Sequence, residues 1–275
     1  MQAANTGGAA GADVDSDPPE EEPSGARTVA VASGIGILGI VLLNVAAVVV
    51  VLGGETAGFE LVEDGGGIAP LPGLAVNGVG QILAFGGLAL GYLRYRGYDL
   101  ASARAYLGVR LLSLRELGAV VGGFVGMIVL LAVVSAIVSL FSSPADNVAA
   151  QNAAENPDAI PAMIVIMLLI VGPFEELLYR GIVQTRLRER FAPVVGIVTA
   201  SVVFASVHAA GALTGTATEI LTTVAVLFVV SLVLGGLYEY TGNLVVPAVV
   251  HGLFNSFQLA GIYFTESGTI GALAL

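Results

Sequence analysis

The sequence predicts an all-α membrane protein, a polytopic bundle of about seven transmembrane helices with one interfacial amphipathic helix. Of its 275 residues, 56% are hydrophobic and only 11% are charged, whereas soluble domains carry about 25% charged residues. The mean hydropathy is +0.91. Apolar runs of about 20 residues, the length that crosses ~30 Å of hydrocarbon, recur along the chain.

The composition excludes several kinds of chemistry. The chain has no cysteine, so a disulfide, a thiolate nucleophile and a cysteine-ligated metal are all ruled out. All ten basic residues are arginine, and 21 acidic residues bring the net charge to −11. Because no basic patch lies outside the membrane flanks, nucleic-acid binding is not expected. Acidic excess without lysine is typical of a halophile-like composition, for which GC-rich codon bias is the alternative explanation.

Four segments are expected along the chain. Residues 1–27 are rich in Ala, Gly, Pro, Asp and Glu and predict a disordered acidic tail. Residues 28–159 hold the N-terminal spans and the interfacial helix. Residues 160–265 form a second transmembrane core that carries the unusual buried ionisable residues, and residues 266–275 form a short tail.

Seven apolar runs are long enough to be considered as spans. The first exceeds the roughly 7–15 apolar residues of a signal peptide, so it is expected to remain in the protein. GxxxG spacing at Gly87 and Gly91, and again at Gly122 and Gly126, predicts close helix packing. The expected spans are 28–54, 74–93, 117–141, 160 to the arginines at 186–190, 193–213, 219–238 and 244–264.

Residues 94–116 differ from the spans because they carry five arginines. Leucine and alanine recur there at spacings of three and four, which makes one apolar stripe. The segment therefore predicts an amphipathic helix on the membrane surface. An ordinary connecting helix packed on protein is the alternative.

Arginine placement predicts the orientation. The loops after the second and fourth spans carry five and three arginines, and the loops after the first, third and fifth carry none. By the positive-inside rule, the N-terminus is expected in the cytoplasm and, with seven spans, the C-terminus outside. The protein is thus expected to be a multi-pass component of the cell membrane.

Two adjacent carboxylates, Glu175 and Glu176, end the apolar run 160–174. Ionisable groups at membrane depth are costly and indicate a functional site. Glu176 and Arg180 are four residues apart and can form an ion pair on one helix face. Glu175 points about 100° away around the helix, which leaves it free to act as a general base.

The two histidines of the chain, His208 and His251, lie in different apolar runs, and Asn255 follows His251 by one helical turn. In a metal-free arrangement, Glu175 and His208 hold a water while His251 and Asn255 stabilise an oxyanion. In the alternative, Glu175, His208 and His251 bind Zn²⁺. No HExxH motif is present, and the metal-free arrangement, with no cofactor, is favoured.

Three motifs together resemble one family. EELLYR at 175–180, FASVH at 204–208 and HGLFN at 251–255 resemble the EExxxR, FxxxH and HxxxN motifs of the CPBP intramembrane proteases. These are also called the Abi or type II CAAX prenyl endopeptidase family. The motifs occur in the family's order, within roughly the last 110 residues of the chain.

The resemblance implies a role for each residue. Glu175 corresponds to the catalytic glutamate and His208 to its partner in water activation. His251 and Asn255 correspond to the oxyanion-stabilising pair, and Glu176 with Arg180 to the supporting ion pair. Phe204 is expected to be a packing residue. The core at 160–265 is then the catalytic unit.

The expected function is that of an intramembrane endopeptidase, a hydrolase often classed with the metalloproteases. Its expected partners are the lipid bilayer and a membrane-associated protein or peptide substrate, with prenylated CaaX-type proteins as the best-known case. Two alternatives stay open. One is a bacteriocin-immunity or scaffold protein of the same fold, and the other is a proton-coupled transporter, because intramembrane Glu and His also line ion paths.

Overall fold

The computed structural model describes residues 24–62, 68–140, 148–209 and 215–266. Within these ranges the chain is helical, with turns between helices and one isolated bridge that pairs Val62 with Ile68. The predicted all-α class is confirmed. Most of the predicted acidic tail, residues 1–23, and the last nine residues, 267–275, lie outside the described ranges.

Six helices in the described part of the chain are long and apolar enough to cross a membrane. The multi-pass bundle is therefore confirmed, with one difference from the about seven spans expected. The helix in the fifth position, α10 (Pro193–His208), has 16 residues, a length of ~24 Å. The six are α1 (Gly25–Thr56), Pro70–Tyr95, α5 (Leu114–Val138), Pro157–Arg188, α11 (Ala217–Thr241) and α12 (Val245–Glu266).

Two of these spans contain π-helical turns. Pro70–Tyr95 consists of α2 (Pro70–Gln81), η1 (Ile82–Gly86) and α3 (Gly87–Tyr95). Pro157–Arg188 is built from η2 (Pro157–Ala159), α7 (Ile160–Ile166), η3 (Met167–Val171), α8 (Gly172–Glu176), η4 (Leu177–Gln184) and α9 (Thr185–Arg188). Pro173 has no N–H to donate, and its ring crowds the preceding turn. The wide π turn of η3 accommodates it, so the helix continues through the glutamate pair.

The predicted interfacial helix at 94–116 is wrong as a single element. Gly97 and Gly108 have φ angles of +85° and +65°, values that end a right-handed helix and suit glycine. Between them lies the seven-residue helix α4 (Leu100–Tyr106), which Asp99 caps. The segment nevertheless keeps an interfacial character, since Leu111 and Leu114 are about 90% exposed among its arginines.

The predicted polar loop at 142–159 also differs from the structure. It contains the short helix α6 (Val148–Glu155), followed by η2. Residues 141–147 lie outside the described ranges. At the N-terminal end, α1 begins at Gly25, three residues before the expected start, because the side chain of Ser24 accepts a hydrogen bond from the Arg27 N–H and caps the helix.

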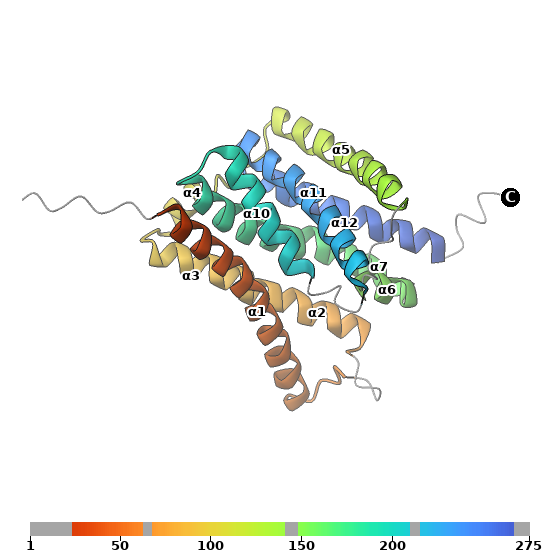
Figure 1. Cartoon of the computed structure of the whole chain (residues 1–275). Helices are drawn as coiled ribbons and strands as arrows, with labels where there is room; N and C mark the ends of the chain where they lie inside the picture. The colour runs from red at the N-terminus through yellow and green to blue at the C-terminus, as the bar shows by residue number, and fades with distance from the viewer. Residues whose placement is uncertain (1–23, 63–67, 141–147, 210–214, 267–275) are drawn as a thin grey trace, which may run out of the picture.

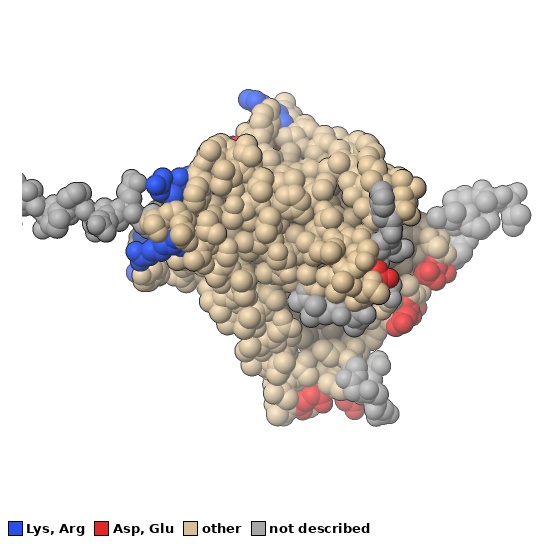
Figure 2. Space-filling view, in the orientation of Figure 1, with Lys and Arg blue, Asp and Glu red and all other residues tan. Residues whose placement is uncertain are grey.

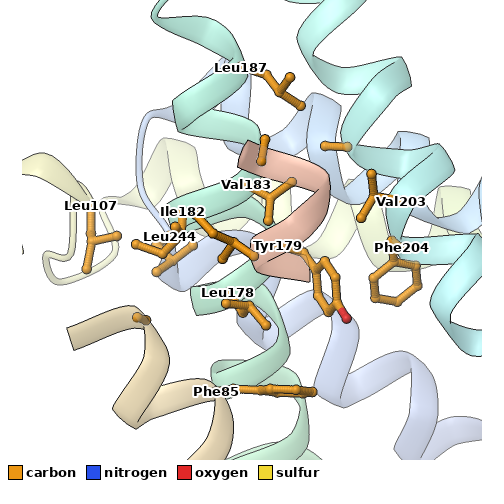
Figure 3. Packing of buried hydrophobic residues seen from close by; sticks show 14 of the residues in the cluster. Phe85, Leu107, Leu178, Tyr179, Ile182, Val183, Leu187, Val203, Phe204 and Leu244 are labelled. Atoms are coloured by element: carbon orange, nitrogen blue, oxygen red, sulfur yellow. The ribbon is translucent and has the colours of Figure 1, made fainter. Parts of the chain in front are cut away.

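Helix α12 packs against several other helices of the bundle (Figure 1). It packs against α5, α7, α8 and α11, while α1 crosses α2 and α10. A core of buried apolar side chains joins α1, α3, η4 and α10 (Figure 3). Helix α8 packs against α12, and His208 at the end of α10 lies 3.5 Å from Glu175 of α8, so the motif residues meet there.

The charged side chains gather at two ends of the molecule. Figure 2 shows arginines at the left and upper edges and acidic residues at the right and lower edges. At the arginine end, Glu189 joins three elements by pairing with Arg96 and accepting from the Tyr106 hydroxyl. Burial and this carboxylate raise the pKa of Tyr106, so the hydroxyl stays a donor. Helix α1 starts at this end (Figure 1).

Close helix contacts fall on other glycines than those predicted. A Cβ added at Gly87, Gly91, Gly122 or Gly126 would meet nothing within 4 Å, so neither GxxxG pair marks a contact. Instead, a Cβ at Gly172 would lie 2.7 Å from the carbonyl oxygen of Ala248 and 2.9 Å from the backbone nitrogen of Gly252. The backbones of α8 and α12 touch there, and this contact holds the glutamate pair beside His251.

Gly172→Ala is expected to destabilise the protein by ~1–3 kcal/mol, because the methyl group meets backbone atoms that cannot rotate away. Thermal unfolding in detergent should show the lower melting temperature. Gly122→Ala is the matched control, and it should be neutral or slightly stabilising because alanine favours the helix by up to ~1 kcal/mol. Equal melting temperatures for the two variants would contradict the proposed contact.

Candidate active site

The glutamate pair is buried in the centre of the bundle. Glu175 and Glu176 end α8, between the π turns η3 and η4, with 8% and 0% of their surfaces exposed. Such carboxylates need compensating charges or donors, because moving a charge out of water costs several kcal/mol even after relaxation. The two carboxylates obtain these partners from different elements.

Glu176 is held on both oxygens. Its Oε2 accepts a hydrogen bond of 2.9 Å from Arg180 Nε, and both side chains are fully buried. Its Oε1 lies 2.9 Å from Nδ1 of His251. Arg180 in turn donates to the hydroxyl of Ser231 on α11 at 2.9 Å. One carboxylate therefore ties η4, α11 and α12 together, as the predicted ion pair requires.

Glu175 faces a different set of groups. Its Oε1 accepts from the amide of Gln81 on α2 at 3.4 Å. Its Oε2 lies 3.5 Å from Nε2 of His208, the last residue of α10, and 3.9 Å from Nε2 of His251. The structure thus brings together the three residues predicted from separate apolar runs.

The hydrogen-bond partners of the two histidines fix where their hydrogens lie. Nδ1 of His208 is 2.7 Å from the carbonyl oxygen of Phe204, and a carbonyl can only accept, so Nδ1 carries the hydrogen. The same reasoning applies to His251, whose Nδ1 faces the Glu176 carboxylate. In their neutral forms both rings therefore present a bare Nε2 towards Glu175 Oε2.

Aromatic rings fix the direction of His208. The ring of Phe204 lies 4.2 Å from that of His208 and 5.0 Å from that of Tyr179, and Arg180 lies over its face at 5.3 Å. Figure 3 shows Tyr179 and Phe204 side by side at the edge of the buried core. Phe204 thus packs against His208, Arg180 and Tyr179 and offers no acid, base or nucleophile, which agrees with its predicted packing role.

Asn255 lies one turn beyond His251 on α12, as its spacing predicts. Its amide nitrogen is 3.8 Å from the sulfur of Met167, and a thioether is a weak acceptor. The described hydrogen bonds do not join Asn255 to Glu175 or to either histidine. The amide N–H of Asn255 is therefore close to the site and makes only a weak hydrogen bond, to the Met167 sulfur.

Two site partners were not predicted. Gln81 was visible in the sequence only as a polar interruption of the second span, and nothing local connects it to a glutamate 94 positions later. Ser231 gave no signal at all, since a serine in an apolar helix is ordinary. Both become site partners only through tertiary packing.

The glutamate and histidine side chains do not have the arrangement of a metal centre. In the described part of the chain, no group of three or more His, Asp or Glu side chains is placed so that it would hold a metal ion. The donors named for zinc, Glu175, His208 and His251, therefore do not form a recognisable cage.

Removing one partner of the Glu176–Arg180 pair should strand a buried charge. Arg180→Ala and Glu176→Gln are expected to lower the free energy of unfolding by ~3–5 kcal/mol and to reduce folded yield. Arg188→Ala is the control, because the Arg188–Glu239 pair is about 30% exposed and such pairs contribute ~0–1 kcal/mol. An Arg180→Ala protein as stable as Arg188→Ala would end the claim that this pair holds the site together.

Comparison with known proteins gives one match. Residues 157–257 match the family model described as Rce1-like, type II CAAX prenyl endopeptidase Rce1-like. No curated protein and no solved structure matches the chain. The matched segment is less than half of the chain, runs from η2 into α12 and includes all three motifs, whereas Gln81 lies outside it. Over this segment, the chain is similar to the type II CAAX prenyl endopeptidase Rce1-like family of proteases.

Proposed function

We propose that this protein is an intramembrane endopeptidase in which Glu175 activates a water for attack on a peptide bond. One observation carries the proposal. Oε2 of Glu175 and Nε2 of His208 lie 3.5 Å apart, although both are hydrogen-bond acceptors when His208 is neutral. Each group has its other polar atom engaged, by Gln81 and by the Phe204 carbonyl. A water that donates to both would resolve the contact.

A water held in this way is prepared for attack. Glu175 takes one of its protons as the oxygen adds to the carbonyl carbon of the substrate, and His208 holds the other hydrogen and so directs the lone pair. When the tetrahedral intermediate collapses, the C–N bond breaks. The proton on Glu175 passes to the leaving nitrogen, which departs as an amine. The glutamate is then a carboxylate again and can activate the next water.

Negative charge that develops on the carbonyl oxygen needs donors. Asn255 supplies an amide N–H, which it can turn from Met167 at little cost. His251 supplies a second N–H from Nε2 when its ring carries a positive charge, because Nδ1–H is already held by Glu176. In that state two carboxylates and two cations balance: Glu175 and Glu176 against Arg180 and His251.

Glu175→Gln keeps the shape of the side chain and its bond to Gln81 but cannot take a proton. Cleavage by the purified protein should fall by at least ~10²–10⁴-fold, without a change in melting temperature. Asn255→Ala should lower kcat by ~10²–10³-fold through the lost oxyanion donor.

Glu266→Gln, at the exposed end of α12, is the control and should cleave like the native protein. If Glu175→Gln cleaved equally well, the hydrolase mechanism would be wrong, and a scaffold or transporter role would explain the site better.

The metal-free mechanism makes a separate prediction. A strong chelator should change neither the cleavage rate nor the melting temperature, and elemental analysis should find no stoichiometric metal. If zinc is the cofactor, both quantities should fall on chelation, since metal binding stabilises the fold that forms its site. Loss of activity that added Zn²⁺ restores would overturn the metal-free mechanism.

We also propose that the arginine end faces the cytoplasm, on the positive-inside rule. The charge separation in Figure 2 supports this orientation. The proposed location is the cell membrane, and the proposed substrates are membrane-associated peptides or proteins. Cleavage of prenylated CaaX-type peptides should be compared with cleavage of the same peptides without the prenyl group.

The orientation can be measured because the chain has no native cysteine. Ala192→Cys lies at the arginine end and Thr265→Cys near the end of α12, and both positions are exposed. A membrane-impermeant thiol reagent applied to intact cells should label Thr265→Cys and leave Ala192→Cys unlabelled until the cells are opened. The reverse pattern would contradict the orientation. Labelling of both positions from outside would contradict an odd number of membrane crossings between Ala192 and Thr265, which α10, α11 and α12 separate.

A further inference from the structure

A cavity of about 700 Å³ lies beside the site at the acidic end of the bundle. It is bounded mainly by α2, α6, α7, η3 and α12. Its polar lining consists of three asparagine amides and one carboxylate, and the rest of its lining is apolar or backbone. The polar residues are Asn77, Asn152, Asn156 and Glu155, and the larger apolar ones are Ile68, Leu74, Val76, Met163, Ile166, Met167 and Leu259.

Two lining residues connect the cavity to the catalytic groups. Asn77 accepts from the Gln81 amide at 3.5 Å, and the same amide donates to Glu175 at 3.4 Å. On the opposite wall, Met167 touches the amide of Asn255. Glu175 and Asn255 do not line the cavity themselves. Its lining is connected to the proposed general base through Gln81 and to the proposed oxyanion donor through Met167.

Gln81 also has an unused acceptor. The side chain is 97% buried, and its Oε1 has no hydrogen-bond partner among the described residues. A buried carbonyl without a donor is costly. Gln81 does not line the cavity itself, so it is connected to the cavity through Asn77, while its amide continues to hold Glu175.

The opposite side of the site is closed by the buried core. Leu178, Ile182, Val183 and Leu187 follow the glutamates towards the arginine end, and each is fully buried (Figure 3). By contrast, Asn77 lines the cavity and is exposed, and the side chain of His208 is 26% exposed. A substrate that approached from the arginine end would have to displace this core.

We propose that this cavity is the substrate-binding cleft of the proposed peptidase, and that it takes an extended apolar peptide of neutral or positive charge from the acidic end of the protein. The asparagine amides can pair with the peptide backbone, and the apolar walls can cover its side chains. None of the lining residues is basic. An anionic segment would therefore meet Glu155 without a compensating cation. This inference rests on the proposed function for its substrate class only.

The first test needs no enzymatic activity. Asn77→Cys, in sealed vesicles of known orientation, should react with a charged, membrane-impermeant methanethiosulfonate added on the side that labels Thr265→Cys. Val79→Cys is the matched control, since it is exposed on the same helix but does not line the cavity. We expect a reaction at least tenfold faster at Asn77→Cys. Equal rates, or reaction of Asn77→Cys from the arginine side, would overturn the proposal.

The second test measures binding apart from cleavage. In the double variant Asn77→Cys with Glu175→Gln, a neutral or cationic apolar peptide should slow the labelling severalfold, and an anionic peptide of the same length should not. Protection without cleavage by the native protein would refute the proposed function and leave the cleft intact. Cleavage by the native protein without protection of Asn77→Cys would refute the cleft alone.

Kinetics give a third readout. Asn77→Leu removes a backbone partner and should raise KM about fivefold, the equivalent of one ordinary hydrogen bond, with kcat unchanged. Gln81→Met keeps the length of the side chain but cannot hold Glu175, so it should lower kcat more than it raises KM. A uniform loss of folded protein in both variants, with kcat and KM of the folded fraction unchanged, would contradict both assignments.

Discussion

The carboxylate of Glu176 is the constraint on which the rest of the structure depends. It is fully buried, and it accepts one hydrogen bond from Arg180 and one from His251. Arg180 also reaches Ser231 on α11. The buried charge of Glu176 thus requires partners from η4 and α12, and Arg180, the partner from η4, also donates a hydrogen bond to α11. Because an unpaired charge in this place would cost several kcal/mol, these helices have little freedom to shift relative to one another.

Backbone features make this arrangement possible. The two adjacent glutamates of α8 meet different partners because neighbouring residues of a helix point about 100° apart. Gly172 and Gly252 let the backbones of α8 and α12 approach to contact, which brings His251 within reach of Glu176. The fixed ion pair then leaves Glu175 to face His208 and Gln81. The difference between one carboxylate held by an arginine and one that faces Gln81 and His208 follows from packing rather than from the carboxylates themselves.

Much of this could be predicted from the sequence, because hydropathy and spacing are local signals. The helical class, the i to i+4 pair of Glu176 and Arg180 and the convergence of Glu175, His208 and His251 all follow from such patterns. The continuous helix at 94–116 was wrong because two glycines adopt positive φ angles there. The GxxxG pairs gave no contact because small residues permit close packing without requiring it. Gln81 could not be predicted as a site residue, since only the tertiary fold brings α2 to Glu175.

The central claim is that Glu175 acts on a water and does not attack the substrate itself. A single turnover in H₂¹⁸O, with enzyme in excess over peptide, tests this directly by mass spectrometry. The account predicts one ¹⁸O in the new carboxylate of the product and none in the enzyme peptide that contains Glu175. If Glu175 attacked the carbonyl carbon, a mixed anhydride would form, and water that opened it at the glutamate carbonyl would leave its oxygen in the glutamate. Label in Glu175 after the first turnover would therefore contradict the general-base mechanism.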